Sequence, residues 1–294
     1  MNNDFRVVLS GGLGNQLFQI TAGMHAAKQN GLRVNFVSAP TKFSKYTHED
    51  EIRDLVNLPI PTWSRSANQR SSIEFRAKRK VATSSSQASK LLKISAPQQI
   101  GYSTDLTEIN SGWTMTGYYQ SYRYLTNVIS DVRQIIKNPL SSNWAMDMAS
   151  LISNKDFTSL HIRRGDYEKL SDRFGLLDFE YYESAMKTIN SKTGKNKFLV
   201  FSDDIQASKR LLAKSQYEID FVEPPAGAPS RESLGLMWLC GNHIIANSSF
   251  SWWGAALATE DGLTIAPTQW MKNGEQIRDL LPGEWVQVDS RWVN

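Results

Sequence analysis

The chain has 294 residues, 40% of them hydrophobic and 21% charged, the balance of a globular protein with enough apolar side chain for buried cores. Its single cysteine, Cys240, excludes a disulfide within the chain, and no run of about 18 apolar residues is present to span a membrane. The first residues also lack the basic and apolar regions of a secretion signal. We therefore expect a cytoplasmic protein.

The N-terminal half begins with a predicted strand, a glycine turn and a helix. Residues 5–9 (FRVVL) are a β-rich run that leads into a turn at Gly11, and the apolar spacing that follows indicates a helix up to Gly31. A second strand, RVNFV, comes next. The pattern then becomes less regular. We expect a basic helical region over residues 66–92, interrupted by a Ser/Gln-rich break, and a strand near residues 113–118.

The net charge of +4 is distributed unevenly. Residues 64–98 contain eight Lys and Arg residues against one acid, Glu74, which gives this segment a net charge of +7. A solvated helical face is the first interpretation of such a segment, and contact with an anionic membrane surface is the second. Nucleic-acid binding comes last, because no reader motif or aromatic stacking platform accompanies the charge.

From residue 157 onward, predicted strands and helices alternate regularly. The strands are FTSLHI, FLVFS, YEIDFV, HIIAN and LTIAP, and the helices between them are FEYYESAMKTINSK, IQASKRLLAK, SRESLGLMWLC and SWWGAALA. This alternation predicts βαβ units and a parallel sheet, whose ligands bind beyond the carboxyl ends of the strands. We place the domain boundary near residue 150, which gives domains over residues 1–150 and 151–294.

The first candidate motif is the glycine turn GGLGNQ, residues 11–16. Glycines let the backbone approach a ligand closely, and two amides at the mouth of a helix favour a polar ligand. The motif is not a dinucleotide fingerprint, because Leu17 stands in place of the third glycine, and it lacks the Gly-Lys-Ser/Thr of a P-loop. A purely structural turn is the alternative.

The second motif, HIRRGDY, lies at the end of a predicted strand. His161 and Arg163 share one face of that strand, and Arg164 points to the other. Two arginines at the ligand end of a parallel strand indicate an anion, because the planar guanidinium group suits bidentate phosphate binding. A structural network of ion pairs with carboxylates is the alternative.

Two further strand ends carry polar residues. Asp203 and Asp204 follow FLVFS, where they could bind ribose or guanine, hold a metal, or cap the next helix. Adjacent carboxylates diverge, and the scattered His residues form no metal-binding pattern, so we expect no metal site. In HIIANSSFSWW, Asn247, Ser248 and Ser249 precede a helix whose N-terminus suits a phosphate, with serine capping as the alternative.

In this order, GGLGNQLFQ, HIRRGDY, FSDD and NSSFSWWGAAL resemble the motifs of family 11 glycosyltransferases, the α-1,2-fucosyltransferases, in their bacterial form. The motifs span residues 11–257 and leave out the basic segment. The resemblance implies a GT-B-like α/β fold with two Rossmann-like domains facing across a cleft, the N-terminal one on the acceptor side and the C-terminal one binding GDP-fucose. It also implies inverting transfer of L-fucose, without metal or other cofactor, to the 2-hydroxyl of a terminal galactose. A lipid-linked glycan such as an O-antigen or surface polysaccharide is the expected acceptor.

The resemblance further implies roles for individual residues. Arg163 would bind the β-phosphate of the donor, and His161 and Arg164 would hold its loop. Together with Asn15 and Asp166, Arg163 is expected to be catalytic. The expected GDP-fucose site is completed by residues of the other motifs, namely Gly12, Gly14, Asp203, Asp204, Asn247, Ser248, Ser249 and Phe250.

A base for the acceptor hydroxyl has to lie within hydrogen-bond reach of it. Asp166 is the first candidate because it follows the arginine pair at the strand tip, and Glu168 and Asp172 are its rivals. Asp166 could instead pair with Arg164 and have a purely structural role.

Three other functions compete with this interpretation. The chain could transfer the sugar of another GDP-sugar such as GDP-mannose, or it could be a GDP-sugar or glycan-binding protein without catalysis. Nucleic-acid binding through residues 64–98 is the most distant alternative, whereas peripheral contact of this segment with the inner membrane is compatible with a transferase.

Overall fold

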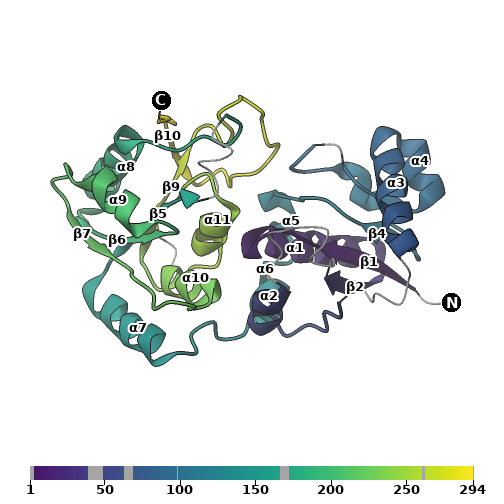
Figure 1. The fold of residues 1–294 in the computed structure, drawn as a ribbon, viewed down its shortest axis with the longest axis horizontal. Helices are drawn as coiled ribbons and strands as arrows, with labels where there is room; N and C mark the ends of the chain where they lie inside the picture. The colour runs from purple at the N-terminus through teal and green to yellow at the C-terminus, as the bar shows by residue number, and fades with distance from the viewer. Residues whose placement is uncertain are drawn as a thin grey trace. The chain divides into compact units, whose positions relative to one another are not determined.

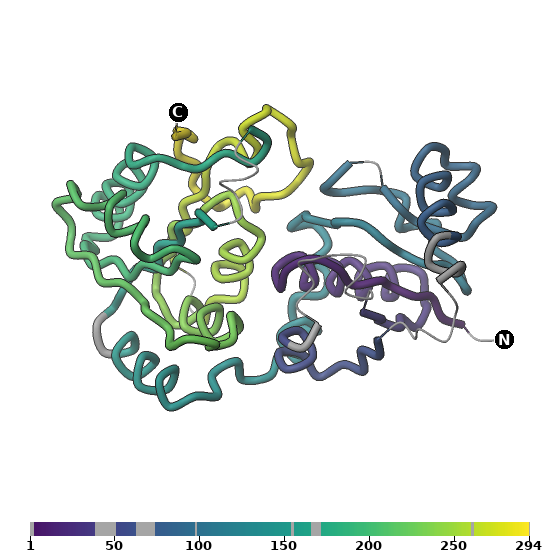
Figure 2. The backbone as a smooth tube through the Cα atoms, viewed as in Figure 1, coloured from purple at the N-terminus to yellow at the C-terminus, as the bar shows by residue number. Residues whose placement is uncertain are grey.

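The computed structural model describes residues 3–38, 49–62, 69–97, 99–165, 172–259 and 262–293. The chain forms two compact units, whose elements are labelled in Figure 1 and whose chain path is traced in Figure 2. Unit 1 comprises Met1–Lys137 and Ile277–Leu280, and unit 2 comprises Asn138–Gln276 and Leu281–Asn294. Each unit is built on a parallel sheet, which confirms the predicted α/β class.

Unit 1 contains a four-stranded parallel sheet. Its strands are β1 (Asp4–Leu9), β2 (Arg33–Ser38), β3 (Ile94–Ser95) and β4 (Thr114–Met115). Its helices are α1 (Leu13–Asn30), α2 (Glu49–Leu55), α3 (Gln69–Ser84), α4 (Ser86–Leu92), the 3-10 helix η2 (Thr104–Glu108), α5 (Tyr122–Thr126) and α6 (Ile129–Ile135). The strand order is β2-β1-β4-β3. Because β1 pairs with β2 on one side and β4 on the other, the carboxyl ends of β1 and β4 form the switch point of this sheet.

Helix α1 packs closely on the sheet of unit 1. Gly23 allows this approach, because a Cβ atom at this position would lie 2.8 Å from the side chain of Val7 and 2.9 Å from that of Phe36. The helix ends at Gly31, whose φ of 61° is in the left-handed region that favours glycine. The predicted strand, glycine turn, helix and second strand at the N-terminus are therefore confirmed.

Helices α3 and α4 form a hairpin (Figure 1). The hairpin packs on β3, the edge strand of the sheet. Ser85 separates them and caps α4, since its hydroxyl accepts a hydrogen bond from the backbone N–H of Ala88. Ala82 of α3 is buried together with Ile94. The expected break within the basic helical region is therefore confirmed.

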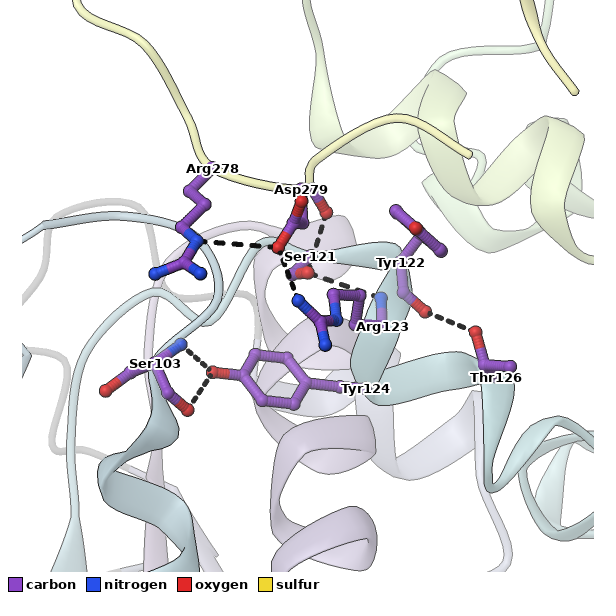
Figure 3. Close-up of polar contacts among 8 residues, drawn as sticks. All are labelled: Ser103, Ser121, Tyr122, Arg123, Tyr124, Thr126, Arg278 and Asp279. Carbon is purple, nitrogen blue, oxygen red and sulfur yellow. Dashed lines mark hydrogen bonds and ion pairs between the residues drawn. The ribbon is translucent and has the colours of Figure 1, made fainter. Parts of the chain in front are cut away.

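A short segment from the far end of the sequence, Ile277–Leu280, completes unit 1, and we call it the return segment (Figure 3). The carbonyl oxygen of Asp279 accepts hydrogen bonds from the Tyr122 N–H (3.0 Å) and the Ser121 hydroxyl (2.6 Å). Its carboxylate lies 3.0 Å from a guanidinium nitrogen of Arg123. The start of α5 is therefore held by residues that are far from it in the sequence.

Gly101 is packed directly against the return segment, with a φ of 120°. A Cβ atom there would lie 2.7 Å from the carbonyl oxygen and 2.9 Å from the nitrogen of Arg278. We expect Gly101→Ala to lower the free energy of unfolding by about 2–4 kcal/mol, measured by urea denaturation. Gly112→Ala is the matched control, because Gly112 also has a positive φ (79°) but has no atom within 4 Å of an added Cβ. The control should cost about 1 kcal/mol, and equal losses in both variants would contradict the tight packing at Gly101.

Unit 2 contains a six-stranded parallel sheet. Its strands are β5 (Thr158–Ile162), β6 (Lys197–Ser202), β7 (Glu218–Phe221), β8 (Asn242–Ile244), β9 (Thr264–Pro267) and β10 (Val286–Val288). Its helices are α7 (Asn143–Lys155), α8 (Phe179–Thr193), α9 (Ile205–Leu212), α10 (Ser230–Trp238) and α11 (Ser249–Ala256). The strand order is β10-β9-β8-β5-β6-β7, which is that of a doubly wound fold.

The alternation of side chains along β6 builds a core on each face of this sheet. Phe198 and Val200 are buried among residues of α8, and Leu199 and Phe201 are buried on the other face, among residues of α7 and α10. His161 of β5 lies on the second face, where its ring contacts Phe250 of α11. The fold therefore fixes β5 rigidly between two packed layers.

The strands and helices predicted after residue 157 are all observed, but the division of the chain differs from our expectation. We expected a boundary near residue 150, whereas the two units divide between Lys137 and Asn138, so α7 belongs to unit 2. The return segment also gives unit 1 a second piece of chain. No described helix has the length and hydropathy needed to cross a bilayer.

Candidate active site

Three of the four motifs meet at one edge of the unit 2 sheet. β5 lies between β6 and β8, and all three strands are parallel, so their carboxyl ends lie side by side. From β5 the chain proceeds to β6 and β7 on one side and later to β8, β9 and β10 on the other, which makes the β5/β8 junction the topological switch point. Ligands of open α/β sheets bind at such a point. The parallel sheet predicted from the sequence is therefore confirmed, and it brings these strand ends together.

Arg163 and Asp203 form the central ion pair of this edge. The guanidinium Nη1 of Arg163 lies 3.0 Å from Oδ2 of Asp203, and the two side chains are 28% and 25% exposed. The other carboxylate oxygen of Asp203 accepts a 2.8 Å hydrogen bond from the backbone N–H of Arg164. Asp203 therefore connects the loop after β5 with the end of β6 and orients a guanidinium group at the solvent-accessible edge.

Arg164 points away from this pair, as the strand alternation predicts. Its side chain is 5% exposed and donates a 2.8 Å hydrogen bond to the carbonyl oxygen of Leu177. The next residue, Gly165, has no room for a side chain, because a Cβ atom would lie 2.4 Å from Oδ2 of Asp203. Arg164 and Gly165 thus shape the loop, and Arg163 is the cation presented at its edge.

His161 is a buried, neutral member of the same cluster. Burial lowers the pKa of its imidazole to about 3, and the positive charge of Arg163 contributes to this shift. Its ring centroid lies 5.6 Å from that of Phe250, and its Nδ1 has no hydrogen-bond partner within the described part of the chain. His161 thus joins the second and fourth motifs by packing, and it adds no charge to the site.

The remaining polar residues of this edge have structural partners. Asp204 caps α9, since its carboxylate accepts a 2.8 Å hydrogen bond from the Ala207 N–H. The amide of Asn247 donates to the backbone carbonyl oxygens of Phe174 (2.7 Å) and Trp270 (3.2 Å). Asp204 thus takes the capping role considered in the sequence analysis, and Asn247 connects β8 to two loops.

The start of α11 is the second feature of this edge that suits an anion. The hydroxyl of Ser248 accepts a hydrogen bond from the Phe250 N–H and caps the helix. Ser249 and Phe250, in the first turn, are partly exposed. A helix N-terminus carries a partial positive charge, so α11 and Arg163 both favour negative charge at the β5/β8 edge.

In unit 1 the glycine turn lies at the switch point between β1 and β4. Gly11 has a φ of 85°, and Gly12 precedes the first turn of α1, which contains Gly14. The side-chain oxygen of Asn15 accepts a 2.6 Å hydrogen bond from the amide of Gln120, in the loop after β4. Unit 1 therefore presents a polar amide pair at the carboxyl edge of its sheet.

Two residues of this edge were not anticipated from the sequence. Gln19 ties the two loops together, since its amide donates to the carbonyl oxygen of Gly117 (3.1 Å) and its oxygen accepts from the Ser10 N–H (2.8 Å). Tyr118, which is 38% exposed, lies beside Gly11, where an added Cβ would be 3.3 Å from its ring. The strand predicted near residues 113–118 was a usable signal, because residues at the end of a parallel strand are candidate site residues. The sequence analysis did not consider the residues at the end of this strand as candidates.

The structure does not test the expected catalytic base. Asp166 and its rival Glu168 lie outside the described residues, and Asp172 is exposed in a turn. Within the described ranges, no group of three or more His, Cys, Asp or Glu side chains is arranged to hold a metal ion.

Comparison with known proteins gives a family. A model described as glycosyl transferase family 11 matches residues 92–289. An alpha-1,2-colitosyltransferase of Escherichia coli is 34% identical over 180 residues, and the O-antigen biosynthesis glycosyltransferase WbnK of Escherichia coli is 30% identical over 191 residues. These alignments cover 59% and 62% of this chain, and the chain spans 62% of the length of each relative. The galactoside alpha-(1,2)-fucosyltransferase 1 of Homo sapiens is 26% identical over 144 residues, which cover 46% of this chain and 39% of that protein.

Solved structures give the same fold at low sequence identity. NodZ alpha-1,6-fucosyltransferase soaked with GDP-fucose matches with a TM-score of 0.51 and 12% identity, over 88% of this chain and 93% of that one. The fucosyltransferase NodZ from Bradyrhizobium matches with a TM-score of 0.50 and 12% identity, over 88% and 94% of the two chains. This likeness concerns the fold alone, and it confirms the GT-B-like class that the motifs predicted.

Proposed function

The chain belongs to glycosyltransferase family 11, and from this premise we propose that it transfers L-fucose from GDP-β-L-fucose to the 2-hydroxyl of a terminal galactose, with inversion. The observation that carries the proposal is the Arg163–Asp203 pair at the β5/β8 switch point, next to the N-terminus of α11. A diphosphate is the part of the donor that suits a guanidinium group and a helix N-terminus.

In this mechanism the protein stabilises the negative charge that grows on the departing diphosphate. The bond between the anomeric carbon and the β-phosphate oxygen breaks as the galactose 2-hydroxyl attacks from the opposite face. Arg163 lies where it could donate to the leaving oxygens, and Asp203 fixes its orientation before the donor binds. Preorganised donors of this kind typically contribute a factor of about 10²–10³ to the rate. We assign no metal to this step, and Asp166 remains the predicted base.

Fewer residues are proposed to bind the nucleotide than the sequence suggested. The side chains of Asp204 and Asn247 already have partners that hold the fold, so we propose that they shape the site rather than bind the nucleotide. Asp203 serves Arg163 and the loop. The remaining candidates for nucleotide contacts in unit 2 are Ser249 and Phe250.

The names of the relatives indicate different donor sugars. One relative is named an alpha-1,2-colitosyltransferase. Other relatives are named galactoside fucosyltransferases, and one is named for O-antigen biosynthesis. We propose fucose as the donor sugar and a galactose-terminated, lipid-linked surface glycan as the acceptor, with GDP-colitose as the specific alternative.

The test is a matrix of donors and acceptors. The enzyme is incubated with GDP-fucose, GDP-colitose or GDP-mannose and with galactosides of either anomer, GDP release is followed, and the linkage of the product is determined by NMR. The proposal predicts GDP release with GDP-fucose that depends on the acceptor and an α-1,2 linkage to galactose. Turnover with GDP-colitose or GDP-mannose but not with GDP-fucose would refute the donor, and binding of GDP-fucose without turnover on any galactoside would refute catalysis.

A further inference from the structure

The α3–α4 hairpin carries a basic surface that the transfer reaction does not use. We define this surface by its exposed cations Arg76, Lys78, Arg79, Lys80 and Lys93. It lies at the β3 edge of the unit 1 sheet, whereas the glycine turn follows β1, two strands away. The surface is therefore separate from the residues discussed above.

Helix α3 packs on the rest of unit 1 through few of its side chains. The half-buried Phe75 and the buried Ala82, seven residues apart, lie on the same helical face and pack with Ile94 and Leu92. In between, every side chain from Arg76 to Val81 is exposed. Helix α4 buries none of its residues. The hairpin thus contacts the protein through one narrow face and presents the rest of its surface to its surroundings.

Charge of one sign dominates this surface. Glu74 is its one acidic residue within α3 and α4, and Lys90 is paired with Glu108 at 3.0 Å. Arg76, Lys78, Arg79 and Lys80 are close together in sequence and Lys93 lies at the end of the same hairpin, so their fields reinforce one another, with a range set by the Debye length of about 10 Å at 0.1 M salt. Such a surface is complementary to a dense array of negative charges.

Two apolar side chains stand among the cations. Leu91 is 85% exposed and Val81 is 51% exposed, and these are two of the five exposed large hydrophobic residues in the part of the chain that the structure describes. Exposure of a leucine side chain to water is unfavourable, and its transfer to the boundary between lipid headgroups and acyl chains is favourable. Phosphate backbones of nucleic acids offer no such apolar layer, and no aromatic side chain of the hairpin is exposed for base stacking.

We propose that the α3–α4 surface docks the protein on a bilayer that contains anionic lipid. The cations contact the headgroups, and Leu91 and Val81 enter the interface. Helical surfaces that combine cations with exposed apolar side chains bind membranes reversibly, and each Lys or Arg near the surface contributes roughly a fivefold gain in partitioning. The proposal concerns binding alone and stands whether or not the donor is GDP-fucose.

The test is co-sedimentation with vesicles of phosphatidylcholine, with and without about 30% phosphatidylglycerol, at about 0.1 M salt. The test variant is Lys78→Gln, Arg79→Gln, Lys80→Gln and Lys93→Gln together. The matched control removes four exposed cations from unit 2, as Lys187→Gln, Lys192→Gln, Arg210→Gln and Lys214→Gln. Both variants lower the net charge equally, so only the position of the charge differs between them.

We expect the wild type and the control to bind the anionic vesicles and not the neutral ones. The hairpin variant should lose about 10²-fold or more in partition coefficient. A second variant, Val81→Ser with Leu91→Ser, should bind several-fold more weakly while it keeps every charge. Unchanged thermal unfolding of all variants shows that the fold is intact.

Three results would overturn the proposal. They are sedimentation of the hairpin variant at the wild-type level, equal losses in the hairpin variant and the control, and retention of the wild type by duplex DNA without binding to anionic vesicles.

Discussion

Arg163→Lys is expected to lower kcat for transfer by about 10²–10³-fold, with a much smaller change in the KM for the glycan. Lysine keeps the positive charge but lacks the planar fork of donors, so it cannot bind two diphosphate oxygens at once or keep the geometry that Asp203 imposes. The measurement is steady-state release of GDP from GDP-fucose with a saturating galactoside.

A purely structural role for Arg163 makes a different prediction. If the guanidinium served only to pair with Asp203, Arg163→Lys would lower the thermal midpoint and leave kcat of the folded enzyme near normal. Arg210→Lys, an exposed substitution on α9, controls for the chemical change and should leave both quantities unchanged. Near-normal turnover by a folded Arg163→Lys enzyme would contradict the role proposed here.

Asp203 offers an independent test of the same arrangement. Asp203→Asn removes the charge that orients Arg163 but keeps an acceptor for the Arg164 N–H. If Asp203 acts through Arg163, the kcat of the double variant should be close to that of Arg163→Lys alone, because the two residues form one unit. Additive losses would show that Asp203 contacts the substrate by itself.

The C-terminal half was predictable because its local pattern agrees with its packing. Strands such as β6 and β9 are apolar runs, helices such as α8 and α9 are amphipathic, and the two alternate along the chain, which predicts a parallel sheet and identifies the strand ends that carry polar residues. The pairing of Arg163 with Asp203 was not predictable in the same way. It depends on β5 and β6 being neighbours, and the alternative that the arginines pair with carboxylates was partly right for this reason.

The fold of unit 1 was harder to predict from the sequence. β3 and β4 have two residues each, too few for a periodic signal, and the amide pair of Asn15 and Gln120 joins residues more than one hundred positions apart. The return segment is similar, because nothing in its local sequence indicates that Asp279 completes a unit formed by the first part of the chain. The expected boundary was misplaced for the same reason, since α7 packs against α10, which lies far along the sequence.

The second large effect is expected in stability, at Glu232. This carboxylate is 1% exposed in the first turn of α10 and accepts four hydrogen bonds from the residues that begin α7. Its Oε1 accepts from the backbone N–H groups of Ser141 (3.1 Å) and Ser142 (2.8 Å) and from the Ser141 hydroxyl (2.7 Å). Its Oε2 accepts from the hydroxyl of Ser142 (2.9 Å), which in turn caps α7. One side chain thus joins the N-termini of two helices.

We expect Glu232→Ala to lower the free energy of unfolding by about 2–3 kcal/mol, because a buried carboxylate is lost that accepts four hydrogen bonds from the partly buried donors of Ser141 and Ser142. Glu232→Gln keeps the shape and one acceptor oxygen and should lose about half as much. Urea denaturation measures both values. Glu223→Gln is the control, since Glu223 is an exposed carboxylate paired with Lys209 and should change stability by less than about 1 kcal/mol.

The stability that Glu232 contributes is expected to depend on pH in a definite direction. Burial of Glu232 opposes its ionisation, but the hydrogen bonds from Ser141 and Ser142 outweigh burial and hold the pKa of the carboxyl below its ordinary value of 4.5. The unfolded chain therefore binds the proton more readily than the folded one, and the carboxylate stabilises the fold fully above the unfolded pKa and progressively less as the pH falls through the folded pKa. The stability difference between the wild type and Glu232→Gln should be constant from neutral pH down to about pH 5.5 and should shrink below about pH 4.5. A difference that grows on acidification would mean that Glu232 is protonated in the folded protein, and the hydrogen bonds to its carboxylate could not then be what joins α7 to α10.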